Sequence, residues 1–205
     1  MKIGIMGGTF NPIHYGHLLM AQASFEEFGL DKMIFIPTGL QWMKKDDPDL
    51  VSGQIRYEMT RLAIEDDPAF ELSDIEIKRP GNTYTCETIA GLKELMPDNE
   101  WYYVTGADTL FNMPKWKDPE KVFDSVILIC ALRGDVKKDE LLEFAGELKD
   151  RYGADIRFLD MPLIGLSSTD IRSRIRDKRS VRYMLPEKVR QYINEKGLYI
   201  NGSGE

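Results

Sequence analysis

Residues 1–19 read MKIGIMGGTFNPIHYGHLL, and this stretch sets the interpretation of the whole chain. The apolar run at 2–6 predicts a strand. The glycine pair at 7–8 lets the backbone turn sharply and approach a ligand without a Cβ in the way. A helix is expected to begin around 15–17, so the chain opens as strand, turn and helix.

The same alternation continues along the 205 residues. Short runs rich in β-branched and aromatic residues predict further strands at 32–37, 70–75, 100–106, 125–132 and 154–160. Apolar spacings of three and four predict helices at 17–29, 52–66, 83–96, 137–153, 167–178 and 186–199. Because the strands are apolar along their whole length, we expect an α/β fold with a doubly wound, mainly parallel sheet and a short helical C-terminal tail. We expect one domain over 1–200 and a flexible tail over 201–205.

The composition narrows the class of protein. A net charge of -7 argues against a protein that coats DNA or RNA. No run of apolar residues is long enough to cross a bilayer and the N-terminus does not resemble a signal peptide, so we expect a cytoplasmic protein that binds neither nucleic acid nor membrane. The two cysteines, Cys86 and Cys130, fit neither a disulfide framework nor a metal cluster, and Cys130 is expected in the core.

The chain has two histidines, and both lie in the first loop, at His14 and His17. A loop that leads into a helix offers free N–H groups to an anion, and residues three apart can aim at the same ligand. The G-x-G-x-x-G fingerprint and the G-K-[ST] motif are both absent, and zinc would lack a third ligand. The alternative is that the histidines only cap or pack the helix start. Because we expect both in a solvent-facing loop, replacing either should leave the fold intact.

The stretch GLSSTDIRSRIR at 165–176 forms a second candidate phosphate site. Ser167 or Ser168 can cap a helix, and Arg172 follows one turn later. An ordinary capped helix explains these residues equally well. Serine hydroxyls and an arginine at a helix start can also bind phosphate, and two such sites suggest a polyphosphate substrate.

The two motifs together resemble the nucleotidyltransferase superfamily with an H-x-G-H loop and a late serine-rich motif. Within it, the chain is similar to bacterial nicotinate-nucleotide adenylyltransferases in the pieces FIPTGLQWMKK, IRYEM, NTYTCETI, TGADTLFNMPKW and LPEKVRQYI. The resemblance implies a Rossmann-like fold and transfer of AMP from ATP to nicotinate mononucleotide, giving deamido-NAD and pyrophosphate in NAD biosynthesis. It also implies Mg²⁺ carried mainly by ATP and water, with no protein metal ligand.

The resemblance assigns site residues by position. The expected catalytic residues are His14, His17, Lys44 and Arg172. The expected ATP-binding residues are Gly7, Gly8, Thr9, Phe10, His14, His17, Arg133, Ser167, Ser168 and Arg172. The expected acceptor-binding residues are Lys44, Tyr84, Thr85, Gly106, Asp108 and Trp116, with backbone N–H groups at 84–85 facing the nicotinate carboxylate and Trp116 under the pyridine ring. Tyr84 and Trp116 could instead be core aromatics.

Three positions depart from the family pattern. Asn11 stands where many members have aspartate, a change expected to matter little, Met43 stands where histidine is common, and Lys117 stands where tyrosine is expected. The rival functions are pantetheine-phosphate adenylyltransferase, a cytidylyltransferase for another phosphorylated acceptor, and a non-catalytic nucleotide-binding module. The sequence leaves open whether the chain forms a homo-oligomer.

Overall fold

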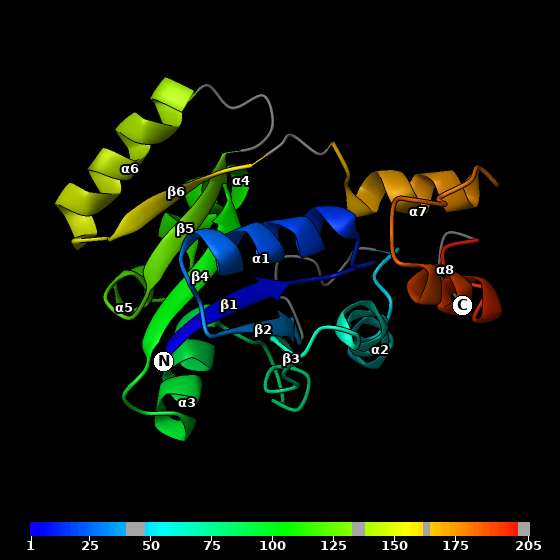
Figure 1. The fold of residues 1–205 in the computed structure, drawn as a ribbon, viewed down its shortest axis with the longest axis horizontal. Helices are drawn as coiled ribbons and strands as arrows, with labels where there is room; N and C mark the ends of the chain where they lie inside the picture. The colour runs from blue at the N-terminus through cyan, green and yellow to red at the C-terminus, as the bar shows by residue number, and fades with distance from the viewer. Residues whose placement is uncertain (40–47, 133–137, 162–164, 201–205) are drawn as a thin grey trace. The chain divides into compact units, whose positions relative to one another are not determined.

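The computed structural model describes residues 1–39, 48–132, 138–161 and 165–200 (Figure 1). Its strands are β1 (Lys2–Gly8), β2 (Lys32–Pro37), β3 (Phe70–Leu72), β4 (Glu100–Gly106), β5 (Ile127–Leu132) and β6 (Ile156–Asp160). Its helices are α1 (Tyr15–Glu27), α2 (Gly53–Ile64), α3 (Thr85–Leu95), α4 (Ala107–Asn112), the 3₁₀ turn η2 (Met113–Lys115), α5 (Pro119–Phe123), α6 (Lys138–Tyr152), α7 (Ser168–Arg176) and α8 (Glu187–Glu195).

The strands form one sheet in the order β3-β2-β1-β4-β5-β6. The pairs β1/β4, β4/β5 and β5/β6 are parallel, with Ile3 opposite Trp101 and Thr105 opposite Cys130. This strand order is the doubly wound arrangement. The chain adds strands toward one edge of the sheet from β1 to β3, and then toward the other edge from β4 to β6. The predicted α/β class and mainly parallel sheet are confirmed.

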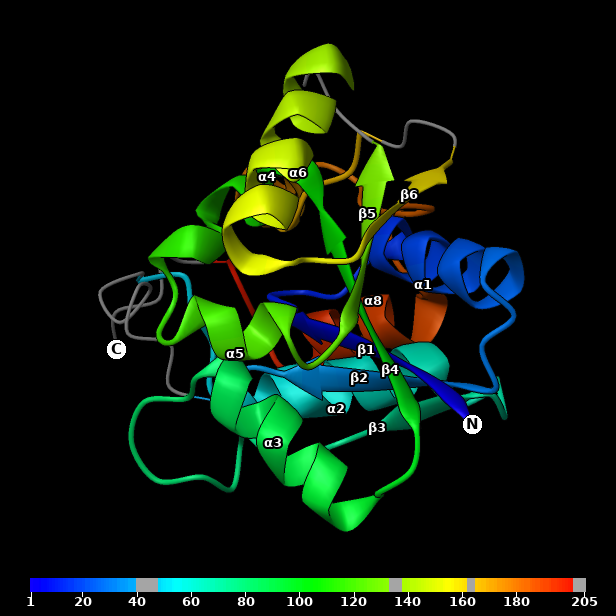
Figure 2. The ribbon, with the colours of Figure 1, turned by 90° about the vertical axis from the view of Figure 1, so that its left-hand side faces the viewer.

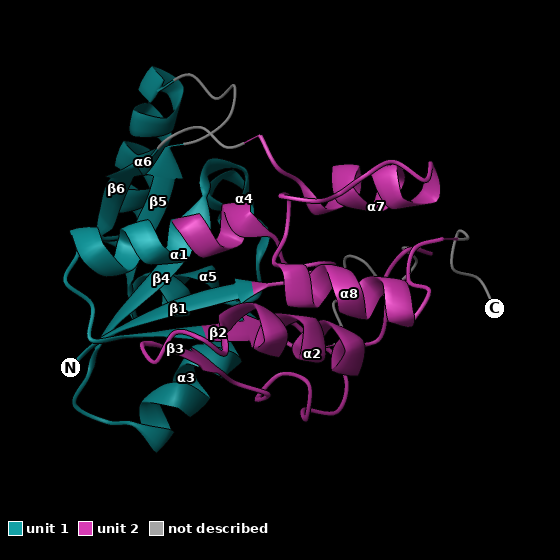
Figure 3. Ribbon diagram, turned by 45° about the vertical axis from the view of Figure 1, so that its right-hand side comes forward, with its two compact units in different colours: residues 1–7, 20–34, 84–164 teal, residues 8–19, 35–83, 165–205 magenta. Residues whose placement is uncertain are grey.

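The chain divides into two compact units, and each draws on three separate segments (Figure 3). Unit 1 contains residues 1–7, 20–34 and 84–164, and unit 2 contains residues 8–19, 35–83 and 165–205. Because the chain passes repeatedly between the units, neither is marked by a linker of distinct composition. The expectation of one domain over 1–200 stays a prediction, and 201–205 lies outside the described residues.

Unit 1 is built on the parallel strands β1, β4, β5 and β6. Helix α4 packs on β4 and β5, and α3 packs against α5 (Figure 2). The middle of β5 is fully buried, as expected for a strand covered on both faces. Cys130 in this strand is 0% exposed, and burial raises the pKa of its thiol to about 12, so it is a core residue as predicted.

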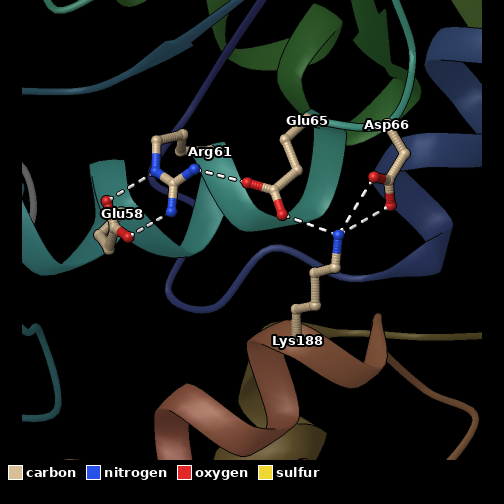
Figure 4. Close-up of polar contacts among 5 residues, drawn as sticks. All are labelled: Glu58, Arg61, Glu65, Asp66 and Lys188. Carbon is tan, nitrogen blue, oxygen red and sulfur yellow. Dashed lines mark hydrogen bonds and ion pairs between the residues drawn. The ribbon is translucent and has the colours of Figure 1, made fainter.

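Unit 2 contains α2 and α8, which pack together. The buried side of α8 carries Val189 and Ile193, four residues apart on one helix face. At the exposed edge of the same contact, Lys188 of α8 forms ion pairs with Glu65 and Asp66 at 2.7 and 3.0 Å (Figure 4). Apolar burial therefore provides most of this contact, and the exposed charges add a smaller, salt-sensitive part.

The structure differs from the predicted elements in several places. The strand predicted at 70–75 is shorter, since β3 ends at Leu72, and β5 and β6 each begin two residues later than predicted. The short helices α4 and α5 and the turn η2 were not predicted, because five or six residues cannot show a helical period. Strand β1 extends through Gly8 instead of ending at Met6. The long predicted helices are all present, and Gly29 and Gly153 follow α1 and α6 with φ of 58° and 67°, as helix-ending glycines do.

Candidate functional site

The first loop turns at Phe10 and not at the glycine pair. Gly7 and Gly8 are the last residues of β1, whereas Phe10 has φ of 48° and is 2% exposed. A Cβ on Gly8 would lie 2.8 Å from the Phe10 ring, and a Cβ on Gly7 would lie 2.9 Å from the Tyr103 hydroxyl. The expected glycine turn is therefore wrong, since packing of aromatic side chains over the strand end is what requires glycine here.

The two histidines lie together at the start of α1. Their rings stack with centroids 3.8 Å apart. The rings of Phe10 and His17 meet edge-to-face, with centroids 5.1 Å apart. The backbone N–H of Gly16 donates to Nδ1 of His14 at 3.1 Å, and the backbone N–H of His14 donates to Nδ1 of His17 at 3.3 Å. A neutral imidazole that accepts at Nδ1 carries its hydrogen on Nε2. Both rings thus present Nε2–H as the donor, which suits an anionic ligand.

The two histidines differ in exposure, which corrects the expectation that both face solvent. His14 is 2% exposed, whereas His17 is half-buried. The His14 ring lies over Gly16, where an added Cβ would lie 3.0 Å from the imidazole. His14 is therefore part of the packing of the loop as well as a candidate phosphate ligand.

The serine motif at the start of α7 is tied to the same loop, within unit 2. Ser167 caps the helix, since its side chain accepts from the N–H of Asp170 at 3.1 Å. The Ser168 hydroxyl donates to the Pro12 carbonyl at 2.9 Å. Nη1 of Arg172 donates to the Asn11 carbonyl at 2.9 Å, and Arg172 is 9% exposed. The structure thus brings the two predicted motifs together, and phosphate binding by α7 stays a prediction.

Asp49 supplies a carboxylate beside α7. Both of its oxygens accept from Nη2 of Arg176, at 2.7 and 2.6 Å, and Nε of Arg172 lies 3.6 Å from Oδ2. Because this carboxylate balances part of the charge of α7, the helix presents less free positive charge to a ligand than its sequence suggests.

Arg56 of α2 joins three segments around the loop. Its guanidinium donates to the carbonyls of Thr9, Thr38 and Val51 at 2.8, 2.6 and 3.1 Å, and the residue is 2% exposed. Burial lowers the pKa of this guanidinium, and Glu76 opposes that shift. Arg56 therefore holds the chain that follows β1 next to the chain that follows β2.

Unit 1 holds the residues expected to bind the acceptor. Tyr84 immediately precedes α3, whose first residue is Thr85, so a helix start occurs where the resemblance puts the nicotinate carboxylate. Trp116 is half-buried and meets Tyr103 edge-to-face, with centroids 6.2 Å apart. Lys117 lies over the Tyr84 ring, 4.3 Å from its centroid. Because the Trp116 ring is partly exposed, its position agrees with either a role in binding the acceptor or a role in packing.

The remaining predicted residues are distributed as follows. Gly106 ends β4 and is buried, and Asp108 lies exposed in the first turn of α4. Lys44 and Arg133 lie outside the described residues, as does most of the loop over 38–51 that was expected at the mouth of the site.

Arg56, Asp49 and Tyr199, whose hydroxyl contacts Asn11, were not predicted as site residues. Each acts through a partner far away in the chain, and such a pairing leaves no local pattern. The only available signal was the family piece IRYEM, which contains Arg56.

Comparisons with known proteins give similar proteins over nearly the whole chain. Residues 5–174 match the model of the cytidylyltransferase-like family. A protein of Lachnoclostridium phytofermentans, described as a probable nicotinate-nucleotide adenylyltransferase, is 42% identical over 199 residues, which are 97% of this chain and 99% of that protein. A protein of Desulfitobacterium hafniense with the same description is 44% identical over 201 residues, 97% of this chain and 95% of that protein.

Solved structures share the fold. The nicotinic acid mononucleotide adenylyltransferase of Plasmodium falciparum complexed with NaAD has a TM-score of 0.79 at 20% identity and covers 97% of both chains. The same enzyme complexed with APC has a TM-score of 0.77 at 19% identity, covering 97% of this chain and 96% of that one.

Proposed function

This chain belongs to the nicotinate-nucleotide adenylyltransferases, a group of nucleotidyltransferases, and we propose that it transfers AMP from ATP to nicotinate mononucleotide in NAD biosynthesis. The products are deamido-NAD and pyrophosphate. The observation that carries the proposal is the stacked histidine pair, whose Nε2–H groups lie at a helix start and suit a polyphosphate.

The reaction needs no nucleophile from the protein. A phosphate oxygen of nicotinate mononucleotide attacks the α-phosphorus of ATP, a new P–O bond forms, and the bond to the bridging oxygen of pyrophosphate breaks, so that pyrophosphate leaves with the electron pair. The protein then has to align two anions and stabilise the charge that develops on the α-phosphoryl group. Nε2–H of His14 or His17 can meet that charge without a proton being transferred.

Mg²⁺ enters this proposal as part of the MgATP substrate. The groups around the loop are imidazoles, backbone N–H groups and guanidinium groups, which suit phosphate oxygens and do not ligate Mg²⁺. The carboxylate of Asp49 is engaged by Arg176 and Arg172. These residues therefore fit an ion that is held by the nucleotide and water.

In unit 1, the start of α3 supports selection of a carboxylate. Thr85 opens a helix whose first N–H groups and dipole favour a negative charge, and nicotinate carries one where nicotinamide is neutral. Trp116 would place its ring against the pyridine. Lys44 and Arg133 complete the proposed phosphate contacts, and we place the enzyme in the cytoplasm.

The test is a product assay on purified protein with ATP and Mg²⁺ and one acceptor at a time. We expect deamido-NAD and equimolar pyrophosphate from nicotinate mononucleotide, at a kcat/KM at least about tenfold above that for nicotinamide mononucleotide. Phosphopantetheine as acceptor and CTP as donor are the matched comparisons. Faster turnover with phosphopantetheine or with CTP than with nicotinate mononucleotide and ATP contradicts the proposal. ATP binding without turnover on any acceptor contradicts it as well.

A further inference from the structure

The side chain of Asn11 makes three hydrogen bonds in the histidine loop, which we define as residues 9–17. It is 3% exposed, and its carbonyl oxygen Oδ1 accepts from the Tyr199 hydroxyl at 2.7 Å and from the Val51 N–H at 3.4 Å. Its Nδ2 donates to the Asp49 carbonyl at 2.9 Å. An amide side chain is needed for this set, because one end accepts while the other donates. Aspartate would place an oxygen against the Asp49 carbonyl, so the expectation that this position matters little is not supported by the contacts.

Tyr199 brings the segment after α8 to this loop. It is 2% exposed and has φ of 65°, a left-handed conformation that a tyrosine adopts only when its surroundings hold it there. Burial raises the pKa of its phenol, so the hydroxyl keeps its proton and acts as the donor to Asn11. The bond spans 188 residues of sequence and joins the two ends of unit 2.

The segment 11–14 is short, so the position of Asn11 bears directly on the histidines. The Asn11 carbonyl is held by Arg172 and the Pro12 carbonyl by Ser168, both at 2.9 Å. His14 follows two residues later and stacks on His17. The side chain of Asn11 adds the contact through which Tyr199 reaches the backbone that carries both imidazoles, beside the direct bonds from Arg172 and Ser168.

We propose that Tyr199 is a positioning residue for catalysis, whose hydroxyl holds Asn11 and through it aligns His14 and His17 with the reacting phosphate. The proposal rests on the proposed adenylyl transfer. Tyr199 touches no substrate in this account, so its loss should slow the chemical step without weakening substrate binding. A displacement of about 1 Å in a catalytic group can lower a rate by as much as about 100-fold.

The kinetic test compares Tyr199→Phe with Tyr192→Phe. Each change removes one hydroxyl, and Tyr192 is a half-buried residue of α8 in the same part of the chain. For Tyr199→Phe we expect kcat to fall about tenfold while KM for ATP and for nicotinate mononucleotide stays within about twofold. Tyr192→Phe should match the wild type in both constants. A kcat for Tyr199→Phe within about twofold of the wild type, at a temperature where both are folded, overturns the proposal.

A spectroscopic test separates this proposal from the assignment of function. Because the chain has only two histidines, the imidazole ¹H–¹³C spectrum of protein without a histidine tag reports the loop alone. We expect Tyr199→Phe to shift the resonances of both rings and Tyr192→Phe to leave them in place. If the wild type transfers no AMP, the proposed function fails, yet the spectra still decide whether Tyr199 sets the loop. Unchanged histidine resonances in Tyr199→Phe overturn the coupling.

A double-mutant comparison tests the route through Asn11. If Tyr199 acts on the histidines through this amide, Tyr199→Phe should cause less than about a twofold further loss of kcat in the Asn11→Ala background. A further loss as large as that in the wild-type background shows that the hydroxyl acts elsewhere, and this result also overturns the proposal.

Discussion

Replacement of the two histidines should separate their roles, although the sequence presents them as a matched pair. Both offer Nε2–H to the phosphate, so alanine at either position should lower turnover by about 10² to 10³. The structure adds a difference in stability, because His14 is 2% exposed and accepts a buried N–H from Gly16, whereas His17 is half-buried. His14→Ala should therefore also destabilise the fold, and His17→Ala should do so much less.

The size of that difference follows from the groups left behind. Without the imidazole, the buried N–H of Gly16 loses its acceptor at 3.1 Å, which costs about 1–3 kcal/mol. The vacated space beside His17 and over Gly16 adds a packing loss. We expect the free energy of unfolding to fall by at least about 2 kcal/mol in His14→Ala, which corresponds to a decrease of roughly 4–8 °C in Tm for a chain of this size.

Urea unfolding and single-turnover kinetics measure the two effects separately. His14→Asn is the matched rescue variant, because an asparagine side chain can accept an N–H two residues onward and so replace Nδ1. It is too short to supply the Nε2–H donor. We therefore expect His14→Asn to regain most of the lost stability while its turnover stays as low as that of His14→Ala.

Two results would refute this reasoning. If His14→Ala unfolds within about 0.5 kcal/mol of the wild type, the Gly16 contact does not stabilise the loop. If His14→Asn recovers both stability and turnover, His14 is a structural residue and His17 alone meets the phosphate.

Three further changes test other parts of the description. Arg56→Met leaves three carbonyls without their buried donor and should lower the free energy of unfolding, measured in urea, by about 3–5 kcal/mol. Arg61→Met is the exposed control from the same helix, and equal losses in the two variants would contradict the role of Arg56 in holding these segments together. The pKa of Glu65 is lowered chiefly by its hydrogen bond from Lys188, so Lys188→Met should reduce stability at neutral pH. The difference in unfolding free energy between this variant and the wild type should vanish as the pH falls through the folded pKa of the Glu65 carboxyl, and a difference independent of pH would show that the Lys188–Glu65 pair is not responsible. Trp116→Ala should raise KM for nicotinate mononucleotide by about tenfold with KM for ATP unchanged in steady-state assays, and a change in the reverse order would place the ring at the wrong substrate.

The sheet and the long helices could be predicted from the sequence because their periodicity is local. Six apolar runs separated by helical spacing leave few alternatives to a doubly wound sheet. The strand end at 7–8 could not be predicted, since Gly7 and Gly8 read as a turn until the Tyr103 hydroxyl and the Phe10 ring are seen to cover them. The helices after Gly106 were hidden by their length and by the prolines within 113–119.

The site was predictable where its residues share one motif and unpredictable where they do not. The histidine pair and the capping role of Ser167 follow from neighbours within a few residues. Arg56 in a helix with polar neighbours looks exposed, and only the carbonyls of distant segments show why it is buried. Burial of His14 also depends on tertiary packing, which a loop sequence does not reveal.

The way unit 2 is assembled restricts how this chemistry can be moved between proteins. Its histidines lie in residues 8–19. Arg56, which donates to the Thr9 carbonyl, lies in 35–83, and Tyr199, which donates to Asn11, lies in 165–205. A gene fragment that ends anywhere before codon 165 encodes both imidazoles without the contacts that Ser168, Arg172 and Tyr199 make with the histidine loop. Recombination that exchanges the codons for residues 84–164 would instead leave the histidine loop and the serine motif intact and would replace Arg133 as the one proposed phosphate contact in that segment. Hybrids made there are the ones in which acceptor preference can change while both motifs are inherited.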